Sequence, residues 1–265
     1  EKPHELPSDP PKDAWPTAGR IEFRSLCLRY RPDLPLALDG LTATIEPGEN
    51  VGVVGRTGAG KSTLIVALLR MVEPDSGAVH IDGLDTRTLG LRRLRSAVSI
   101  VPQDPVLHEG SVAHNIDPFG TVPEAELRTA LRRARLDPNI LSEPVARGGS
   151  NFSAGERQLL CIARALVSHS HILLMDEATS NLDEVSDQTV QELIRNEFAS
   201  HTVLTIAHRL LTVAEFDRIF VLGGGRLVEE GRPDHLLGDS SSELSRMAAA
   251  LGPSARSELR TRAQR

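Results

Sequence analysis

Cysteine and long apolar runs are scarce in this sequence of 265 residues. The two cysteines, Cys27 and Cys161, are too few for a disulfide framework, and each lies among apolar residues. We therefore expect buried free thiols in a reducing compartment. No stretch of about 18 apolar residues is present, and the acidic, proline-rich start has no signal-peptide pattern. The composition instead suits a large globular domain that buries a real core.

Lysine is scarce as well. It occurs three times, against 27 arginines, and two of these positions, Lys2 and Lys12, lie in the proline-rich start. Lys61 is therefore the one lysine in the body of the chain, at a position where arginine does not serve. The net charge is −6 and the two signs are mixed along the sequence, so we expect no general binding to nucleic acid or to anionic lipid.

Strand and helix patterns alternate along most of the chain. Strands are expected at 21–30, 41–46, 50–54, 78–82, 97–101, 171–175, 202–206 and 218–222, and helices at 61–71, 123–135, 154–167, 184–198 and 209–215. Such alternation predicts an α/β fold with a mainly parallel sheet covered on both faces. The strands nearest the start are expected to form an antiparallel β part.

The composition also suggests domain boundaries. Residues 1–20 hold five prolines among polar residues and are expected to be a linker. One domain is expected over 21–240, with an inserted helical subdomain over about 104–167, where the alternation is interrupted. The segment LGGGR, 222–226, is expected to be a turn between the last two strands. Residues 241–265 are expected to be a polar, basic tail with a short frayed helix.

A glycine-rich segment between an expected strand and an expected helix fits the pattern G-x-x-x-x-G-K-[ST] of phosphate-binding loops. Its candidate nucleotide-binding residues are Gly55, Arg56, Thr57, Gly58, Ala59, Gly60, Lys61, Ser62 and Thr63. The glycines let the backbone curl so that N–H groups face phosphate oxygens, and the helix N-terminus adds its positive dipole end. Lys61 is expected to reach the β- and γ-phosphates as a compact charge, and Ser62 to offer Mg²⁺ a hydroxyl. The sequence thus predicts ATP and Mg²⁺ as cofactors.

Two carboxylates follow a buried-looking strand in ILLMDE, residues 172–177. We predict that Asp176 holds Mg²⁺, directly or through water, and that Glu177 orients and deprotonates an attacking water. An apolar strand that ends in acids is common and usually marks only a strand end. The phosphate loop is what favours the catalytic interpretation here.

Two further polar residues follow expected strands. Gln103 is a candidate to touch both Mg²⁺ and water, and His208 is a candidate to hydrogen-bond a γ-phosphate. A lone Gln or His at a strand end is usually a polar terminus and nothing more. The same context makes both residues candidates for the catalytic site.

The segment FSAGERQLLCIARAL, residues 152–166, is less generic. It resembles the signature segment of ABC-transporter nucleotide-binding domains, and the other motifs follow in that family's order. GRTGAGKS is similar to the Walker A motif, Gln103 to the Q-loop, ILLMDE to Walker B, SNLD (180–183) to the D-loop and His208 to the H-loop. The resemblance covers about residues 20–238 and implies a P-loop NTPase fold of the RecA-like kind.

Finer features resemble the C subfamily, the multidrug-resistance-associated proteins, and particularly their second nucleotide-binding domain. They are FRSLCLRYRPDLPLAL, VPQDPVL, NIDPF and DEATSNLD. In that family an aromatic residue upstream of Walker A stacks on adenine. The matching position is Tyr30, the only tyrosine in the chain, for which an ordinary edge-strand aromatic is the alternative.

The resemblance also implies a head-to-tail sandwich of two such domains, with each ATP between one Walker A and the other domain's signature helix. It assigns Ser153 and Gly155 to nucleotide contact across that interface. Ser153-x-x-Glu156 is at the same time a capping box for the helix that it opens. Phe152, Ala154 and Glu156 depart from the usual L-S-G-G-Q. The added methyl group and negative charge are expected to weaken the grip on nucleotide.

The function implied is the ATP-hydrolysing motor domain of an exporter at the cytoplasmic face of a membrane. Its expected partners are a second nucleotide-binding domain and transmembrane domains, and its expected cargo, by analogy alone, is organic anions, thiol conjugates or drugs. One alternative is an ATP-gated regulatory domain with little turnover, against which Glu177 argues. Another is a soluble ABC ATPase acting on DNA repair or ribosomes, for which the sequence shows neither coiled coils nor a nucleic-acid footprint.

Overall fold

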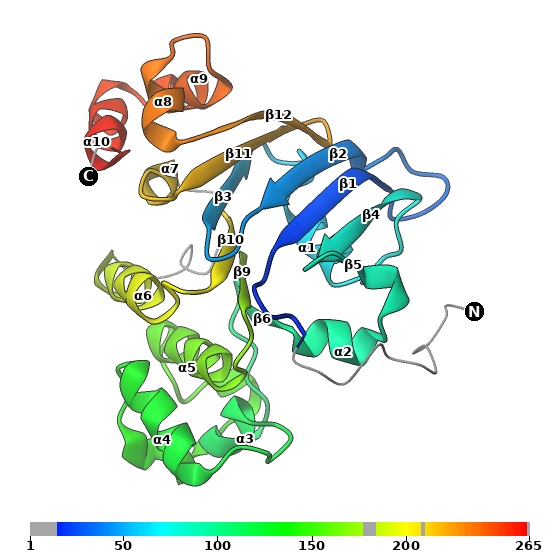
Figure 1. The fold of residues 1–265 in the computed structure, drawn as a ribbon. Helices are drawn as coiled ribbons and strands as arrows, with labels where there is room; N and C mark the ends of the chain where they lie inside the picture. The colour runs from blue at the N-terminus through cyan, green and yellow to red at the C-terminus, as the bar shows by residue number, and fades with distance from the viewer. Residues whose placement is uncertain (1–14, 177–183, 208–209, 264–265) are drawn as a thin grey trace. The chain divides into compact units, whose positions relative to one another are not determined.

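The structure, a computed structural model, describes residues 15–176, 184–207 and 210–263 (Figure 1). The chain divides into two compact units. Unit 1 comprises Glu1–Ala97 and His201–Arg265, and unit 2 comprises Val98–Ser200. Among the described residues, no helix combines the length and the apolar character that a bilayer crossing requires.

Unit 1 holds four strands in the order β12-β11-β3-β10. Their bounds are β3 Asn50–Gly55, β10 Thr202–Ile206, β11 Arg218–Gly223 and β12 Arg226–Gly231. β3 pairs in parallel with both β10 and β11, and β12 runs antiparallel to β11. All five residues of β10 are buried, as expected for a parallel strand whose two faces are both covered.

A second, antiparallel sheet of unit 1 has the order β2-β1-β4-β5. Its strands are β1 Ile21–Leu28, β2 Leu38–Ile45, β4 Ser76–Ile81 and β5 Leu84–Asp85. Buried Ile21 and Phe23 alternate with more exposed neighbours, but the next buried residue is Leu26, three positions on. The pairing register shifts between Phe23 and Leu26, and Ser25 between them has a φ of +44°, so a bulge accounts for the broken alternation.

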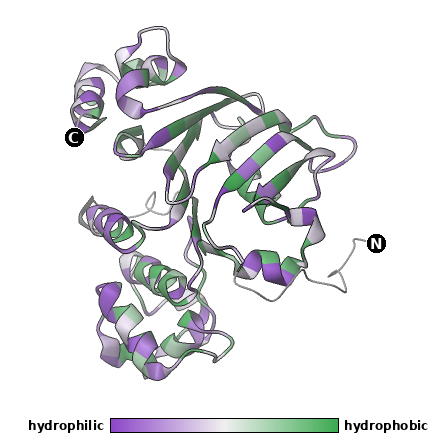
Figure 2. Cartoon of the chain, viewed as in Figure 1, coloured by the Kyte–Doolittle hydropathy of each residue, from purple (hydrophilic) through white to green (hydrophobic). Residues whose placement is uncertain are grey.

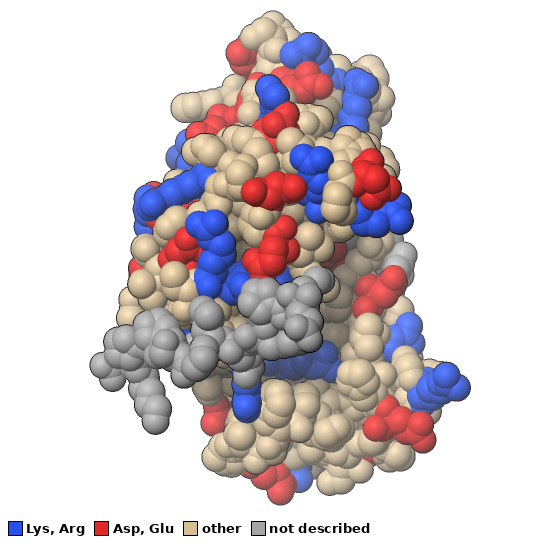
Figure 3. Space-filling view, turned by 90° about the vertical axis from the view of Figure 1, so that its right-hand side faces the viewer, with Lys and Arg blue, Asp and Glu red and all other residues tan. Residues whose placement is uncertain are grey.

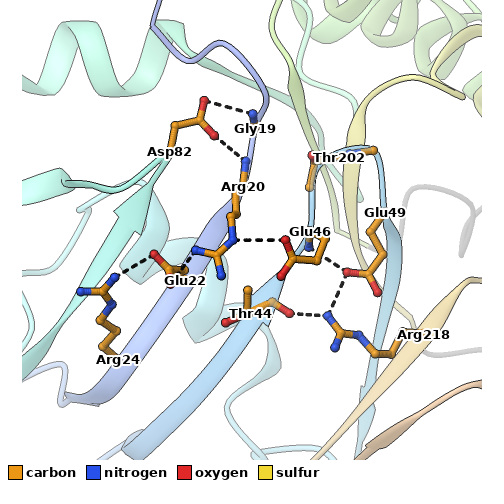
Figure 4. Close-up of polar contacts among 11 residues, drawn as sticks. Gly19, Arg20, Glu22, Arg24, Thr44, Glu46, Glu49, Asp82, Thr202 and Arg218 are labelled. Carbon is orange, nitrogen blue, oxygen red and sulfur yellow. Dashed lines mark hydrogen bonds and ion pairs between the residues drawn. The ribbon is translucent and has the colours of Figure 1, made fainter.

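Polar contacts join the two sheets of unit 1 (Figure 4). Arg218 of β11 donates to the carboxylate of Glu49 at 2.8 Å and to the carbonyl oxygen of Thr44. The amide of Gly48 donates to the hydroxyl of Thr202 at 3.0 Å. These contacts fix the turn between β2 and β3, and hence the start of the strand that leads to the glycine-rich loop.

Residues 15–20, expected to be part of a linker, are fastened to the end of β4. The carboxylate of Asp82 accepts four consecutive backbone N–H groups, from Thr17 at 2.7 Å, Ala18 at 2.9 Å, Gly19 at 3.2 Å and Arg20 at 2.7 Å. Figure 4 draws the contacts with Gly19 and Arg20. Burial acts to raise the pKa of Asp82, but these hydrogen bonds outweigh it and hold the pKa below its ordinary value. The carboxylate therefore stays ionised.

Trp15 adds two contacts to the same attachment. Its indole N–H donates to the carbonyl oxygen of Ile81 at 3.1 Å, and the guanidinium of Arg93 lies 5.8 Å from its ring centroid. The part of the expected linker that the structure describes is thus attached to unit 1 along its length.

The helical elements of unit 1 are α1 Lys61–Leu68, η1 Thr86–Thr88, α2 Leu91–Ser96, α7 Leu210–Val213, α8 Pro233–Gly238, α9 Glu243–Ala250 and α10 Pro253–Ala263. The expected tail thus forms two helices, α9 and α10, instead of one frayed helix. Leu244, Ala248 and Leu259 are buried, and they join a core cluster with residues of β3 and β11. Glu229 of β12 fixes the start of α9, because its carboxylate accepts the Ser242 hydroxyl and the amides of residues 243 and 244.

Unit 2 pairs two parallel strands, β6 Val98–Val101 and β9 Ile172–Asp176, and a short antiparallel pair, β7 Gly110–Ser111 and β8 Pro144–Val145. Its helical elements are α3 Val112–Ile116, α4 Glu124–Arg133, η2 Pro138–Ser142, η3 Arg147–Gly149, α5 Ala154–Val167 and α6 Glu184–Glu197. α4 packs on α5, and its residues Leu127, Ala130 and Leu131 are buried. In Figure 2 α6 carries both purple and green residues, as β1 does.

The predicted fold class is confirmed: parallel strand pairs flanked by helices, an antiparallel sheet formed by strands near the start, and a helix-rich unit within the chain. Some details differ. The expected helix 61–71 ends at Leu68, and Met71 is 56% exposed instead of packed. Both cysteines are free as expected, but only Cys161 is buried, while Cys27 is half-buried. Burial raises the pKa of the Cys161 thiol, which makes its thiolate form scarce.

Candidate nucleotide-binding site

The glycine-rich loop lies between β3, which ends at Gly55, and α1, which begins at Lys61. Gly60 caps the helix with a φ of +100°, and a Cβ atom there would stand 2.6 Å from the carbonyl oxygen of Ala37. A side chain is therefore excluded by conformation and by space. The loop backbone curls as a phosphate-binding turn requires.

Lys61, the first residue of α1, is 6% exposed. Its ammonium group donates to the carbonyl oxygens of Gly55 at 2.9 Å and Arg56 at 3.3 Å. The lysine thus folds back over the loop that it follows. Ala59 and Thr63 are buried, whereas the hydroxyl-bearing residues Thr57 and Ser62 are exposed.

Tyr30 lies between β1 and β2 and is 47% exposed. Its hydroxyl oxygen is 3.1 Å from the hydroxyl oxygen of Thr63 on α1. The predicted base-stacking residue is therefore in contact with the helix that follows the phosphate loop, and part of its ring is open to solvent.

A cavity of about 500 Å³ adjoins the loop on another side. It is lined by the loop from Gly55 to Ala59, by the turn after β11 and by α9. The described residues that line it include neither Tyr30 nor Ser62. This cavity is therefore not the space in which a base stacked on Tyr30 would lie.

The turn between β11 and β12 supports the loop, a role that the sequence did not suggest. The amide of Gly225 donates to the carbonyl oxygen of Ala59 at 3.1 Å, and its carbonyl oxygen accepts the amide of Asp39 at 2.9 Å. A Cβ atom at Gly225 would stand 2.8 Å from the carbonyl oxygen of Ala37. The three consecutive glycines 223–225 could have indicated this role, because a tight turn alone needs fewer than three glycines.

In unit 2, the structure brings Asp176 and the segment before Gln103 to one end of a strand pair. β6 and β9 run in parallel, with Val101 opposite Met175. Asp176 is the last residue of β9, and Gln103 follows β6 by two residues; both are half-buried. Polar groups at the carboxyl ends of neighbouring parallel strands are well placed to act together.

Gln158 is a further residue of this region that the sequence analysis missed. Its side chain is 1% exposed, and its amide group donates to the carbonyl oxygen of Pro102 at 3.3 Å. It thereby ties α5 to the segment that carries Gln103. A glutamine on the apolar face of the expected helix 154–167 was the signal that could have identified it.

The signature segment forms the start of α5, and its capping box is present. The Ser153 hydroxyl accepts the Glu156 amide at 3.2 Å, and the Glu156 carboxylate accepts the Ser153 amide at 2.8 Å. The backbone and side-chain hydrogen bonds of Ser153 lower the pKa of Glu156, so the carboxylate is ionised at the helix N-terminus. Gly155 approaches α6: a Cβ atom there would lie 3.2 Å from the Ser186 hydroxyl oxygen.

Two of the predicted catalytic residues, Glu177 and His208, lie outside the described residues, as does the expected D-loop, 180–183. The residues that the structure describes fit a magnesium nucleotide. In unit 1 the curled loop and Lys61 suit phosphate oxygens, and Ser62 carries a hydroxyl. In unit 2, taken by itself, Asp176 and Gln103 carry the hard oxygen atoms that Mg²⁺ prefers. Magnesium commonly takes only one or two protein ligands beside the phosphates, so a larger cluster of carboxylates is not required.

A loop of this kind between a parallel strand and a helix defines a P-loop NTPase. The comparisons make the class more specific. A family profile described as "ABC transporter" matches residues 38–180. The chain belongs to this family and has the fold of its ATP-binding domains, which are ATPases.

Individual relatives agree with that assignment. The chain is 49% identical over 235 residues to ABC transporter C family member 8 of Dictyostelium discoideum, covering 86% of this chain and 15% of that protein. It is 46% identical over 249 residues to ATP-binding cassette sub-family C member 2 of Rattus norvegicus, covering 91% of this chain and 16% of the relative. These identities confirm the predicted resemblance to the C subfamily. The chain spans about a sixth of the length of these relatives.

A solved structure is similar over almost the whole chain. It is that of a bacterial Atm1-family ABC exporter with ATP bound, with a TM-score of 0.85 and 34% sequence identity, covering 94% of this chain and 44% of the other.

Proposed function

We propose that this chain is the ATP-hydrolysing motor domain of an exporter, positioned at the cytoplasmic face of a membrane. The observation that carries the proposal is the curled glycine-rich loop with the buried Lys61 folded over it. The likeness to an exporter with ATP bound, and to members of the C subfamily, supports it.

In this proposal the residues of unit 1 bind the nucleotide. Tyr30 stacks on adenine, and residues 55–63 hold the phosphates through their amides. Lys61 neutralises charge on the β- and γ-phosphates. Bound Mg²⁺ would screen the phosphate charge, and Ser62, Asp176 and Gln103 are the residues that would hold it. Glu177 accepts a proton from the attacking water, and His208 hydrogen-bonds the γ-phosphate.

The partner is proposed to be a second nucleotide-binding domain, arranged head-to-tail, in a chain or assembly that also carries transmembrane domains. Ser153 and Gly155 then meet the nucleotide held by the partner. Glu156 keeps its negative charge at that place, and Ala154 adds a methyl group. Both features weaken the signature, so the two composite sites are proposed to be unequal.

The proposed cargo is organic anions, thiol conjugates or drugs. One relative supports the drugs in this class. It is the pleiotropic ABC efflux transporter of multiple drugs of Candida glabrata, 42% identical over 254 residues, covering 88% of this chain and 15% of that protein. Organic anions and thiol conjugates rest on the resemblance to the C subfamily alone.

The test is steady-state phosphate release with the partner domain present, comparing the wild type with Glu177→Gln. A motor domain predicts clear turnover in the wild type and a loss of roughly 100-fold or more in the variant, because the base that activates water is gone. If both proteins are equally slow while ATP still binds, the alternative of an ATP-gated regulatory domain is favoured.

The nucleic-acid alternative finds no support in the charge distribution. On the face in Figure 3, basic and acidic side chains are interspersed instead of gathering by sign. Many are paired, as in Arg20 with Glu22 at 2.6 Å and Arg226 with Asp39 at 2.6 Å. Tight, salt-sensitive retention of DNA or RNA in a filter-binding assay would revive that alternative.

A further inference from the structure

A hydroxyl pair joins the predicted base-binding residue to the phosphate-binding helix. The side-chain oxygens of Tyr30 and Thr63 are 3.1 Å apart, and either can be the donor. The two residues are 33 positions apart in the sequence, so the contact belongs to the fold and not to a local turn. Tyr30 is 47% exposed, whereas Thr63 is 5% exposed.

We propose that Thr63 is a positioning residue for base recognition. Its hydroxyl holds the ring of Tyr30 in the orientation that stacks on a flat purine base. The inference rests on the proposed function, in which Tyr30 stacks on adenine, and it goes beyond that function by assigning what fixes the ring.

The anchor is well suited to this task because it is itself immobile. Thr63 is the third residue of α1, and its amide donates to the carbonyl oxygen of Gly60 at 3.1 Å. Its buried side chain has little freedom to move. A half-exposed aromatic side chain in a connecting segment, by contrast, has two rotatable bonds and no dense packing to select one rotamer.

Fixing the ring in advance raises affinity, because the entropy cost of ordering it is met before the nucleotide binds. The hydroxyl contact occupies one end of the ring, and the residue is 47% exposed, so the contact itself does not prevent stacking. The increase in affinity applies only to ligands that carry a base. Inorganic tripolyphosphate, which shares the phosphate contacts, does not use Tyr30.

The same hydrogen bond also fastens the base subsite to the phosphate subsite. Thr63 follows Lys61 and Ser62 on one helix turn, so an adjustment of α1 around the phosphates is passed to the tyrosine ring. Base and phosphate recognition are therefore expected to be coupled, and loss of the hydroxyl pair should uncouple them.

Isothermal titration of the full chain with Mg-ATP and with Mg-tripolyphosphate tests the proposal. Tyr30→Phe keeps the ring and removes the hydroxyl, and Thr63→Val keeps the shape and removes the partner. Each is expected to weaken ATP binding by about two- to ten-fold, the effect of one neutral hydrogen bond. The double variant should lose no more than either single variant, and Thr63→Ser should restore most of the affinity.

Tripolyphosphate binding is expected to be unchanged in Tyr30→Phe. Thr129→Val is the matched control, because this exposed threonine of α4 makes its hydroxyl contact with its own helix. It should bind both ligands as the wild type does.

A spectroscopic measurement isolates the ring itself. Because Tyr30 is the only tyrosine, ring-labelled tyrosine gives NMR signals from this residue alone. Mg-ATP should shift these signals through the ring current of the base, while Mg-tripolyphosphate should not. In Thr63→Val without nucleotide, the ring signals should show faster averaging than in the wild type.

The outcomes separate this proposal from the one it rests on. If Tyr30→Phe binds ATP like the wild type while Tyr30→Ala binds it more weakly, stacking stands and the role of the hydroxyl pair is refuted. Weaker binding of both ligands by Thr63→Val, with Tyr30→Phe unaffected, would mean that Thr63 acts on the phosphates, which also overturns the proposal. Unchanged ATP affinity in Tyr30→Ala would remove the stacking assignment itself.

Discussion

Lys61 carries its charge at a position that is 6% exposed. A buried cation is costly unless polar groups surround it, and the carbonyl oxygens of Gly55 and Arg56 serve here. These hydrogen bonds hold the ammonium group close to the loop. The proposed contact with the β- and γ-phosphates would account for a lysine here, in a chain body that otherwise uses arginine.

A Lys61→Arg variant should keep the fold and lose activity. The planar guanidinium is wider than an ammonium group, so it cannot enter the space between the loop carbonyls in the same way. We expect phosphate release to fall by roughly 100-fold, the order seen when a donor to a developing charge is lost. Thermal unfolding checks that the variant remains folded.

Arg132→Lys is the reverse exchange at an exposed position of α4 and should leave turnover unchanged. Phosphate release by Lys61→Arg at the wild-type rate would contradict the role assigned to the ammonium group.

Helices and strands set by local patterns were predicted from the sequence, whereas those that depend on long-range contacts were not. β10 and α5 have the expected bounds, because an apolar run and a capping box are both local signals. The short α2 was not expected, since six residues with three arginines give little periodicity. Packing of α9 and α10 was also missed, because it depends on Glu229 and on a cluster formed by distant strands.

In the candidate site, too, consecutive residues were predicted and distant supporting residues were not. The strand–loop–helix arrangement of residues 50–68 was predicted from the spacing, since strand, glycines, lysine and helix are consecutive. The support from Gly225 was not, because its hydrogen bond to Ala59 spans more than half of the chain. Spacing in the sequence thus predicts consecutive candidate residues more readily than it predicts the distant residues that hold them in place.

The turn after β11 offers a test of that support. Gly224 and Gly225 both have positive φ, but a Cβ atom at Gly224 meets nothing within 4 Å, whereas one at Gly225 meets the Ala37 carbonyl oxygen at 2.8 Å. Asparagine tolerates positive φ, so Gly224→Asn should be nearly neutral. Gly225→Asn should lower the free energy of unfolding by about 2 kcal/mol or more and weaken ATP binding.

Denaturant unfolding and ATP titration of the two variants make the comparison. Equal stability and equal affinity in both would show that the turn does not support the phosphate loop.

The attachment of residues 15–20 through Asp82 should depend on pH. Its folded pKa is lower than the ordinary value of 3.8 that it has in an unfolded chain. A group of this kind contributes stability above its unfolded pKa and loses it as the pH falls through the folded value. We therefore expect the amides of residues 17–20 to be protected from hydrogen exchange at neutral pH, and to lose protection only below about pH 4.

Asp82→Asn should lower that protection and remove its dependence on the Asp82 titration, because the neutral amide accepts fewer and weaker hydrogen bonds. Asp33→Asn is the control and should leave the protection unchanged. Asp33 is exposed, and among the ion pairs of the described residues its partner is Arg31 alone, at 3.8 Å. Undiminished protection in Asp82→Asn would show that other contacts hold the segment.

For the whole molecule, the proposed head-to-tail pairing makes one nucleotide-binding domain act on the nucleotide of another. Glu156 is then the residue whose charge matters most outside the chain's own site. Its capping role needs a hydrogen-bond acceptor but not a charge, so glutamine can replace it there.

Glu156→Gln should strengthen ATP binding at the partner's site by about two- to five-fold, since it removes an anion from a helix N-terminus that faces phosphates. The chain's own site should be unaffected. Titration of the paired domains, with the partner's Walker A lysine intact or substituted, separates the two sites. No change at either site would contradict the pairing or the position of the signature within it.

The claim on which all of this depends is that the loop 55–63 binds a magnesium nucleotide. Isothermal titration of the purified chain with Mg-ATP tests it most directly, with Lys61→Ala as the matched variant and circular dichroism to confirm that both are folded. We predict saturable binding to the wild type and binding at least tenfold weaker in the variant. A folded wild-type chain that takes up no Mg-ATP at millimolar concentration, or a variant that binds it equally well, would contradict the account.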